Sequence, residues 1–208
     1  MMDIVEQYKI LHQTTPSYGA GGGQYLSEVR LFIDYLKPTS VLDFGCGKES
    51  LIRKLAHHYP QIEFYGYDPA IPGRDTLPIE KADLIITTDV LEHIPEDALP
   101  DVVETMASIS DHVFAVLHHA LAERILSSGT NAHCTVKPPQ WYYELFGRYF
   151  NTPHPLPGRN PCLSALITFP LPGKIMRDYH RIVAEPTRLQ KIWNEIQYRF
   201  TKCSTDAF

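Results

Sequence analysis

The sequence predicts an α/β fold in which a doubly wound, mostly parallel sheet carries helices on both faces. The first observation behind this prediction is that short apolar runs of strand type alternate with helical patterns between residues 40 and 119. The second is size and composition, because 208 residues with 44% hydrophobic and 21% charged residues suit one globular domain with a substantial core. We therefore expect residues 1–208 to form a single domain.

The N-terminal part is predicted to hold a glycine-rich loop followed by one amphipathic helix. The loop is SYGAGGGQY, at residues 17–25. Apolar residues then recur at helical spacing, at Tyr25, Leu26, Val29, Phe32, Ile33 and Leu36. Pro38 follows this pattern and marks the end of the helix.

The central part is predicted to supply the parallel strands and the helices between them. Strands are expected at 40–44, 62–68, 82–90 and 112–119, and helices at 50–59 and 95–109. The segment between Asp68 and Asp83 departs from this alternation, because it contains three prolines and one glycine. Such a segment disfavours a full helix, so we expect it to be reduced to a turn and a short strand.

The C-terminal part shows a looser order of elements. Helices are expected at 121–128, 139–150 and 186–200, a loop at 129–139, and a strand at 164–169. The last of these helices is predicted from an apolar face formed by Leu189, Ile192, Ile196 and Phe200.

The stretch VLDFGCGKES, at residues 41–50, is the main candidate for a ligand site, because a glycine turn (residues 45–47) follows a buried strand. It is not a phosphate-binding P-loop, since Leu42 stands where that motif needs its first glycine and Glu49 where it needs a hydroxyl. The dinucleotide pattern G-x-G-x-x-G survives on spacing, with Ser50 in the third glycine position and an acid, Asp68, about 20 residues downstream.

Asp43 distinguishes between the remaining ligands. A carboxylate two residues before the first glycine opposes an anionic pyrophosphate and suits a cationic ligand. A ligand with an ammonium group, a sulfonium and a ribose diol would use both Asp43 and Asp68. S-adenosylmethionine has all three groups.

Three successive segments, VLDFGCGKES, FYGYDPA and ADLIITTDVLEHIPEDAL, resemble the motifs of class I S-adenosylmethionine-dependent methyltransferases. The resemblance covers residues 24–120 and implies a Rossmann-like fold, abbreviated between the second and fourth motifs, with S-adenosyl-L-methionine as the cofactor. On this basis we expect an N-terminal lid and helix at 1–37, a donor-binding core at 38–120 and an acceptor side at 121–208. The residues implied at the donor site are Asp43, Gly45, Cys46, Gly47, Asp68, Pro69, Asp89 and Val90.

The resemblance also implies roles for several of these residues. Asp43 faces the methionine ammonium, Asp68 accepts hydrogen bonds from the ribose hydroxyls, and Asp89 lies beside the transferable methyl group. Family members carry a third glycine at the position of Glu49. We expect Glu49 to have a negative φ and to begin the following helix, where the helix dipole favours an acid.

Histidines near the carboxyl ends of the strands are the candidate general bases for the acceptor. The catalytic candidates are His119, His118 and His133. For His93 the resemblance implies a structural role. The spacing of these histidines matches no metal motif, so no metal is expected.

The expected function is methyl transfer by in-line displacement to an oxygen or nitrogen of a small-molecule or glycan-type acceptor. A NAD-dependent oxidoreductase and a non-catalytic ligand-binding module are the alternatives. The net charge of −5 disfavours generic nucleic-acid binding, and no apolar run reaches the roughly 18 residues of a membrane helix. Four scattered cysteines and the lack of a signal-peptide pattern favour a cytoplasmic location. The sequence does not define an oligomeric state.

Overall fold

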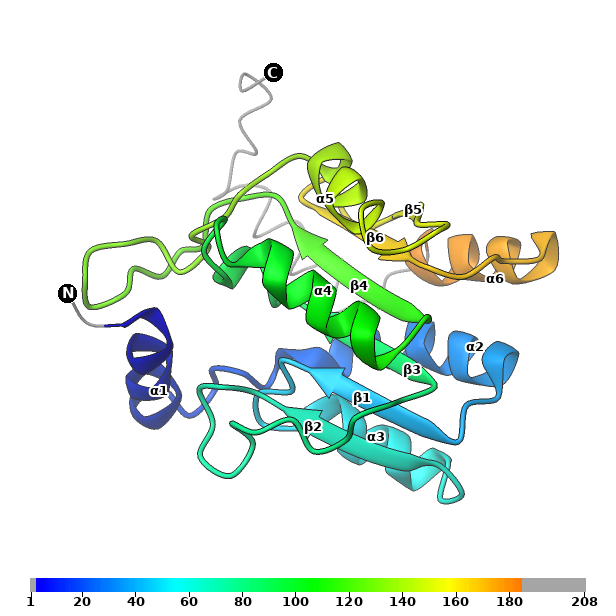
Figure 1. Cartoon of the computed structure of the whole chain (residues 1–208), viewed down its shortest axis with the longest axis horizontal. Helices are drawn as coiled ribbons and strands as arrows, with labels where there is room; N and C mark the ends of the chain where they lie inside the picture. Colours follow the sequence, from blue (N-terminus) through cyan, green and yellow to red (C-terminus); the bar gives the residue numbers. More distant parts are fainter. Residues whose placement is uncertain (1–2, 185–208) are drawn as a thin grey trace.

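The computed structural model describes residues 3–184 and contains one six-stranded mixed sheet (Figure 1). The strands are β1 (Ser40–Phe44), β2 (Glu63–Tyr67), β3 (Leu84–Thr88), β4 (Val113–His118), β5 (His154–Pro157) and β6 (Leu163–Ile167). Their order in the sheet is β2-β1-β3-β4-β6-β5. The first four are parallel, whereas β6 runs antiparallel to both β4 and β5. The predicted doubly wound, mostly parallel fold class is therefore confirmed.

Helices cover both faces of this sheet. One face packs against α2 (Leu26–Leu36), α3 (Ser50–His58) and α6 (Gly173–Ala184), and the other against α4 (Leu99–Ile109) and α5 (Pro139–Phe146). Successive residues of β1 divide between the two cores, because strand side chains alternate in direction: Val41 joins the first core and Leu42 the second. The first helix, α1 (Ile4–Thr14), lies apart, beyond the carboxyl ends of the parallel strands (Figure 1).

The segment between β2 and β3 is abbreviated, as predicted, but it does not contain the expected short strand. Its backbone forms local turns instead, in which Asp68 N donates to Arg74 O and Arg74 N donates to Ile71 O, both at 2.9 Å. Prolines in this segment lack an amide hydrogen, so they cannot continue a ladder of strand hydrogen bonds. Among the described residues the sheet therefore ends at β2 on this side.

The expected helix at 121–128 is wrong. This stretch is an irregular loop in which Ile125 forms a single antiparallel bridge with Asn131. The Asn131 side chain accepts a hydrogen bond from Ala122 N (3.0 Å) and donates one to Ala122 O (2.8 Å). These bonds satisfy backbone groups that a helix would have used, and the apolar side chains of Leu121 and Ile125 are left exposed.

Other elements differ from the predictions in their bounds or were not predicted. The helix expected to begin at residue 95 begins at Leu99, and part of the glycine-rich loop forms a 3-10 helix, η1 (Gly21–Tyr25). The sequence patterns did not predict α1, β5 or α6. Strand β5 has the sequence HPLP, and its two prolines are tolerated because it lies at the edge of the sheet. The helix expected at 186–200 lies outside the described residues.

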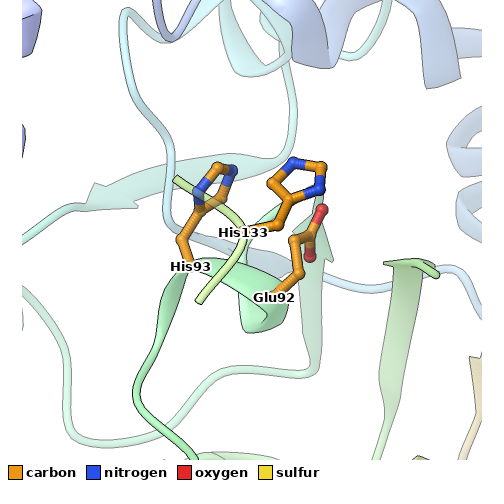
Figure 2. Close-up of side chains that lie close together, drawn as sticks. All are labelled: Glu92, His93 and His133. Atoms are coloured by element: carbon orange, nitrogen blue, oxygen red, sulfur yellow. The ribbon is translucent and has the colours of Figure 1, made fainter. Parts of the chain in front are cut away.

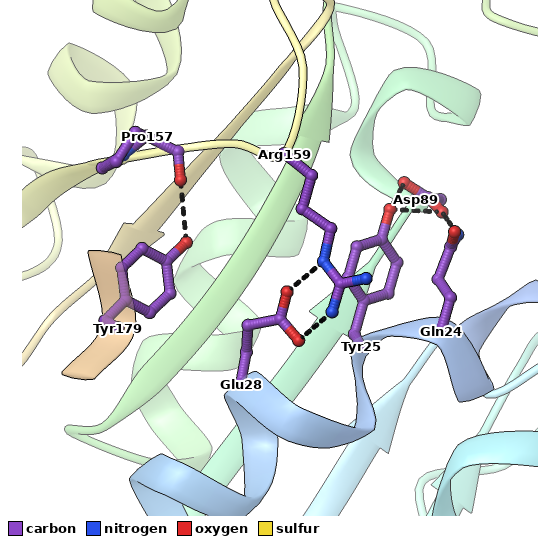
Figure 3. Close-up of polar contacts among 7 residues, drawn as sticks. All are labelled: Gln24, Tyr25, Glu28, Asp89, Pro157, Arg159 and Tyr179. Atoms are coloured by element: carbon purple, nitrogen blue, oxygen red, sulfur yellow. Dashed lines mark hydrogen bonds and ion pairs between the residues drawn. The ribbon is translucent and has the colours of Figure 1, made fainter. Parts of the chain in front are cut away.

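A buried ion pair joins α2 to the connection between β5 and β6. In this pair the guanidinium of Arg159 binds both carboxylate oxygens of Glu28 (Figure 3). The side chains of Arg159 and Glu28 are only 8% and 2% exposed. The same guanidinium lies 5.8 Å from the centroid of the Tyr25 ring. The pair therefore helps to place Tyr25 at the edge of the site described below.

We predict that Glu28→Ala destabilises the fold by about 3 kcal/mol, because it removes the carboxylate partner of a buried guanidinium. Urea denaturation would detect this loss as a lower transition midpoint. The control replaces both Glu28 and Arg159 with Met, which removes both charges and should restore most of the lost stability. A Glu28→Ala variant as stable as the wild type would contradict this account.

Candidate active site

A cavity of about 730 Å³ lies between α1 and the carboxyl ends of β1, β2 and β3. In the sheet, β1 lies between β2 and β3, so the strand order reverses at β1. The cavity lies at this point of reversal, which is where open α/β sheets bind ligands. All eight residues predicted for the donor site line this cavity: Asp43, Gly45, Cys46, Gly47, Asp68, Pro69, Asp89 and Val90. The sequence motifs therefore converge on one place in the fold.

The glycine turn is held against β2 and also contacts the N-terminal segment. Gly45 N donates a hydrogen bond to Tyr67 O at 2.7 Å. Gly45 and Gly47 have φ values of 86° and 49°, and a Cβ on Gly47 would lie 2.4 Å from Gly19 O. Glycine at position 47 thus lets the N-terminal segment approach the turn, where Lys48 N donates to Gly19 O at 2.8 Å.

Glu49 differs from the expectation based on the sequence. Its φ is 59°, in the left-handed region, so the predicted negative φ is wrong. The residue is the N-cap of α3, and its carboxylate pairs with Arg74 (2.6 Å) and Arg53 (3.2 Å). A left-handed conformation costs a non-glycine residue roughly 1–2 kcal/mol, and the ion pairs offset part of this cost. Glycine would adopt this conformation without strain. The strained conformation of Glu49 is accepted because its carboxylate holds Arg74 of the connection after β2.

Asp68 joins the glycine turn to the end of β2. Its Oδ2 accepts a hydrogen bond from Gly47 N (3.0 Å), and its Oδ1 accepts one from Ala70 N (2.9 Å). The residue is buried, yet it lines the cavity. Each carboxylate oxygen keeps a second lone pair, so this side chain can also accept hydrogen bonds from a ligand diol.

Asp43 is a buried acid whose charge is unfavourable in the free protein. Burial, followed by the negative charges of Asp68 and Glu49, raises the pKa of Asp43 to about 8. Its carboxyl group is therefore mostly protonated near neutral pH. A cationic group of a ligand would favour the ionised form and lower this pKa, so the position is suited to bind a cation.

Asp89 follows β3 and is oriented by the N-terminal segment (Figure 3). The Tyr25 hydroxyl lies 2.8 and 2.9 Å from the two carboxylate oxygens and donates to this carboxylate, and Gln24 Nε2 donates to Oδ2 at 3.3 Å. Burial raises the pKa of Asp89 to about 6, and these hydrogen bonds limit the rise. The φ of Asp89 is 55°, so its backbone is strained at a point that lines the cavity.

The three predicted bases are not among the described residues that line the cavity. Both ring nitrogens of His119 have partners at 2.7 Å, a backbone carbonyl and the Ser164 hydroxyl, so this side chain links β4 to β6 and the following loop. His118 and His133 form a row of rings with His93, in which neighbouring centroids lie 4.7 and 4.8 Å apart. His93 is the member of the row that lines the cavity.

Helix α1 supplies lining residues, Tyr8 among them, that the sequence interpretation missed. Tyr8 and Tyr18 line the cavity, and their rings stack with centroids 6.4 Å apart. The Tyr8 hydroxyl also donates to Ala132 O at 2.6 Å, which ties α1 to the loop after β4. The signal that could have predicted α1 is the helical spacing of Ile4, Val5, Tyr8 and Leu11.

The chain matches the family model of the methyltransferase domain over residues 18–149. This match covers more than half of the chain, and the chain belongs to this family. The predicted class, a class I S-adenosylmethionine-dependent methyltransferase with S-adenosylmethionine as its cofactor, is thereby confirmed. No curated protein matched the sequence. Within residues 3–184, no helix is long and apolar enough to cross a membrane.

Solved structures of methyltransferases share the fold. A protein from Nostoc punctiforme assigned as an O-methyltransferase superposes with a TM-score of 0.57 at 12% identity, over 78% of this chain and 60% of that one. Human N-acetylserotonin methyltransferase in complex with S-adenosylmethionine gives 0.54 at 14% identity, over 77% and 55%. Mitomycin 7-O-methyltransferase gives 0.52 at 14% identity, over 77% and 59%. The matched part thus spans 55–60% of the length of these proteins, and at such identities the likeness shows the Rossmann-like fold alone.

We predict that the affinity for S-adenosylhomocysteine rises between about pH 5.5 and pH 7.5, approaching tenfold per pH unit. Over this range the pH is below the Asp43 pKa of about 8, so binding of the ligand's ammonium group must ionise Asp43 and release a proton. Isothermal titration calorimetry across the range would measure the slope. Asp43→Asn should weaken binding at the upper end and flatten the pH dependence, and an unchanged slope in this variant would contradict the assignment.

Proposed function

We propose that this chain transfers the methyl group of S-adenosylmethionine to an oxygen atom of a small-molecule acceptor. The observation that carries the proposal is the pair of buried carboxyls, Asp43 and Asp68, at the glycine turn beside the cavity of about 730 Å³. This volume is within the range of small-molecule sites. Asp43 binds the methionine ammonium of the donor, and Asp68 accepts hydrogen bonds from its ribose hydroxyls.

The same charge pattern argues against the alternative of a NAD-dependent oxidoreductase. A dinucleotide would bring its pyrophosphate to the glycine turn, where Asp43 and Asp68 line the cavity and Glu49 follows the turn. The Asp68 carboxylate would repel the phosphates, and Asp43 would stay protonated beside them. The ammonium group of S-adenosylmethionine instead favours the ionised form of Asp43 and is attracted to it. The family match also supports methyl transfer rather than hydride transfer.

The remainder of the cavity supports an acceptor with an apolar or aromatic body. Its walls on the side of α1 and the start of α4 include Ile4, Val5, Tyr8, Ile94, Pro95 and Val102. Such walls bury an apolar body at lower cost than a densely hydroxylated sugar, whose hydroxyls would need partners. An oxygen acceptor agrees with the O-methyltransferase descriptions of two of the similar structures. We therefore favour a phenol or an alcohol over the glycan-type acceptor.

Methyl transfer of this kind is an in-line displacement at a carbon that the sulfonium already activates. An electron pair of the acceptor oxygen attacks the methyl carbon, the carbon–sulfur bond breaks with its electrons kept by sulfur, and the acceptor proton passes to solvent. The main task of the chain is to align the two reactants. Since His118 and His133 stand behind His93 rather than at the cavity, we assign them an indirect role and assign His119 a structural one.

We predict that Asp68→Ala weakens the binding of S-adenosylhomocysteine by about 1–3 kcal/mol, roughly 5- to 150-fold, because the ribose hydroxyls lose their acceptor. Asp75→Ala is the matched control, since Asp75 is exposed in the same connection and does not line the cavity. Calorimetry would measure both variants. Equal binding by Asp68→Ala and the wild type would contradict the assignment, as would thermal stabilisation of the wild type by NAD but not by S-adenosylhomocysteine.

Turnover is tested separately, with labelled S-adenosylmethionine and a panel of phenols, alcohols and sugars. We expect label in phenols or alcohols. Label in sugars alone would contradict the acceptor proposal. Binding of S-adenosylhomocysteine with no label in any compound would favour the non-catalytic ligand-binding module.

A further inference from the structure

Glu92, His93 and His133 converge beside the cavity (Figure 2). Glu92 and His93 belong to a short 3-10 segment, η2 (Leu91–His93), which follows β3, whereas His133 lies in the long loop after β4. Each residue offers one ligand atom, and these atoms all lie within 4.8 Å of one another. The cluster joins residues from two distant segments, so sequence spacing does not predict it.

Glu92 is a fully buried carboxyl, and neither of its oxygens has a hydrogen-bond partner among the described residues. Burial raises the pKa of Glu92 well above its usual range, and the negative charge of Asp89 raises it further. The backbone amides of Glu92 and His118 lie near enough to oppose this rise in part. Unsatisfied buried carboxyls are rare in folded proteins, because they cost free energy that a partner would recover.

Both histidines have one ring nitrogen fixed by the backbone. His93 Nδ1 lies 2.7 Å from Ala132 O, and His133 Nδ1 lies 2.6 Å from Ala120 O. A carbonyl oxygen only accepts, so each Nδ1 carries the proton and each Nε2 keeps a lone pair. Hydrogen bonds of this type orient the histidines of metal sites. Burial also lowers the pKa of both imidazoles, which keeps them neutral near pH 7.

We propose that Glu92, His93 and His133 bind one divalent first-row transition-metal ion, with Zn²⁺ and Mn²⁺ as the ions to test. Two imidazoles and one carboxylate are a common ligand set for such ions, whereas Ca²⁺ and Mg²⁺ prefer oxygen ligands. The positive charge of the ion compensates the buried carboxyl of Glu92 and the nearby carboxylate of Asp89. Three protein ligands leave at least one coordination position open.

The open coordination position lets the ion bind the acceptor hydroxyl during catalysis. This part of the inference rests on the proposed methyl transfer. His93 lines the cavity, so an ion bound to it can also meet an acceptor hydroxyl there. Coordination lowers the pKa of that hydroxyl, whose proton passes to solvent. The oxygen then forms a bond to the methyl carbon while the carbon–sulfur bond breaks, and S-adenosylhomocysteine is released. None of the three predicted bases lines the cavity, so the ion takes over the activation of the acceptor hydroxyl.

Metal binding can be measured without any assay of activity. The full chain is stripped with a chelator, dialysed, and titrated by calorimetry with Zn²⁺ and Mn²⁺, and separately with S-adenosylhomocysteine. We expect one ion per chain, and we expect Glu92→Gln to lower its affinity roughly 100-fold or more, since it removes the charged ligand. His133→Gln is a second variant in case the first does not fold. The control is His58→Gln, which removes an exposed histidine of α3 and should leave the affinity unchanged.

The parallel titrations separate failure of the metal site from failure of the proposed function. Metal-free wild type that binds S-adenosylhomocysteine but takes up no ion would overturn the metal site and leave the donor site standing. Uptake of an ion without binding of S-adenosylhomocysteine would support the metal site and count against the methyltransferase. Equal ion affinity in the wild type and in the folded Glu92→Gln or His133→Gln variants would overturn the metal site as well.

Discussion

The rest of the site depends on the hydrogen bonds of the Asp68 carboxylate, because they join the glycine turn to the connection after β2. One oxygen holds Gly47 N in the glycine turn, and the other holds Ala70 N in the connection after β2. The same turn receives the N-terminal segment, since Gly19 O accepts a hydrogen bond from Lys48 N. Together with the hydrogen bond from Gly45 N to Tyr67 O, the Asp68 side chain thus fixes the glycine turn that the N-terminal segment contacts.

Buried acids give the site its chemical character. Asp43, Asp89 and Glu92 gather at the carboxyl ends of neighbouring strands, and burial raises the pKa of each. In such a place every negative charge is costly, so an anionic ligand is disfavoured and a cationic ligand recovers free energy. A sulfonium donor and a divalent metal ion both carry the positive charge that stabilises these buried acids in their ionised form. The preference for S-adenosylmethionine over a dinucleotide thus follows from desolvation as much as from the shape of the glycine turn.

The parallel strands and the gathering of the candidate donor residues at one cavity could be predicted, because both follow from short-range patterns. Strand ends that carry Asp43, Asp68 and Asp89 meet at one edge of a parallel sheet, so sequence order alone brings these residues together. Rotations of side chains and loop contacts could not be predicted in this way. The stretch at 121–128 forms a loop instead of the expected helix, because the Asn131 side chain binds both backbone groups of Ala122. The contact between His133 and His93 depends on the path of the same loop after β4.

The most direct test of the central claim is a crystal structure of the chain with S-adenosylhomocysteine. Our account predicts that the ribose hydroxyls lie within hydrogen-bonding distance of the Asp68 carboxylate and that the methionine ammonium lies on the side of Asp43. The sulfur should point toward the part of the cavity bordered by Asp89 and His93. Ligand density elsewhere on the protein, or a ribose that makes no contact with Asp68, would contradict the account.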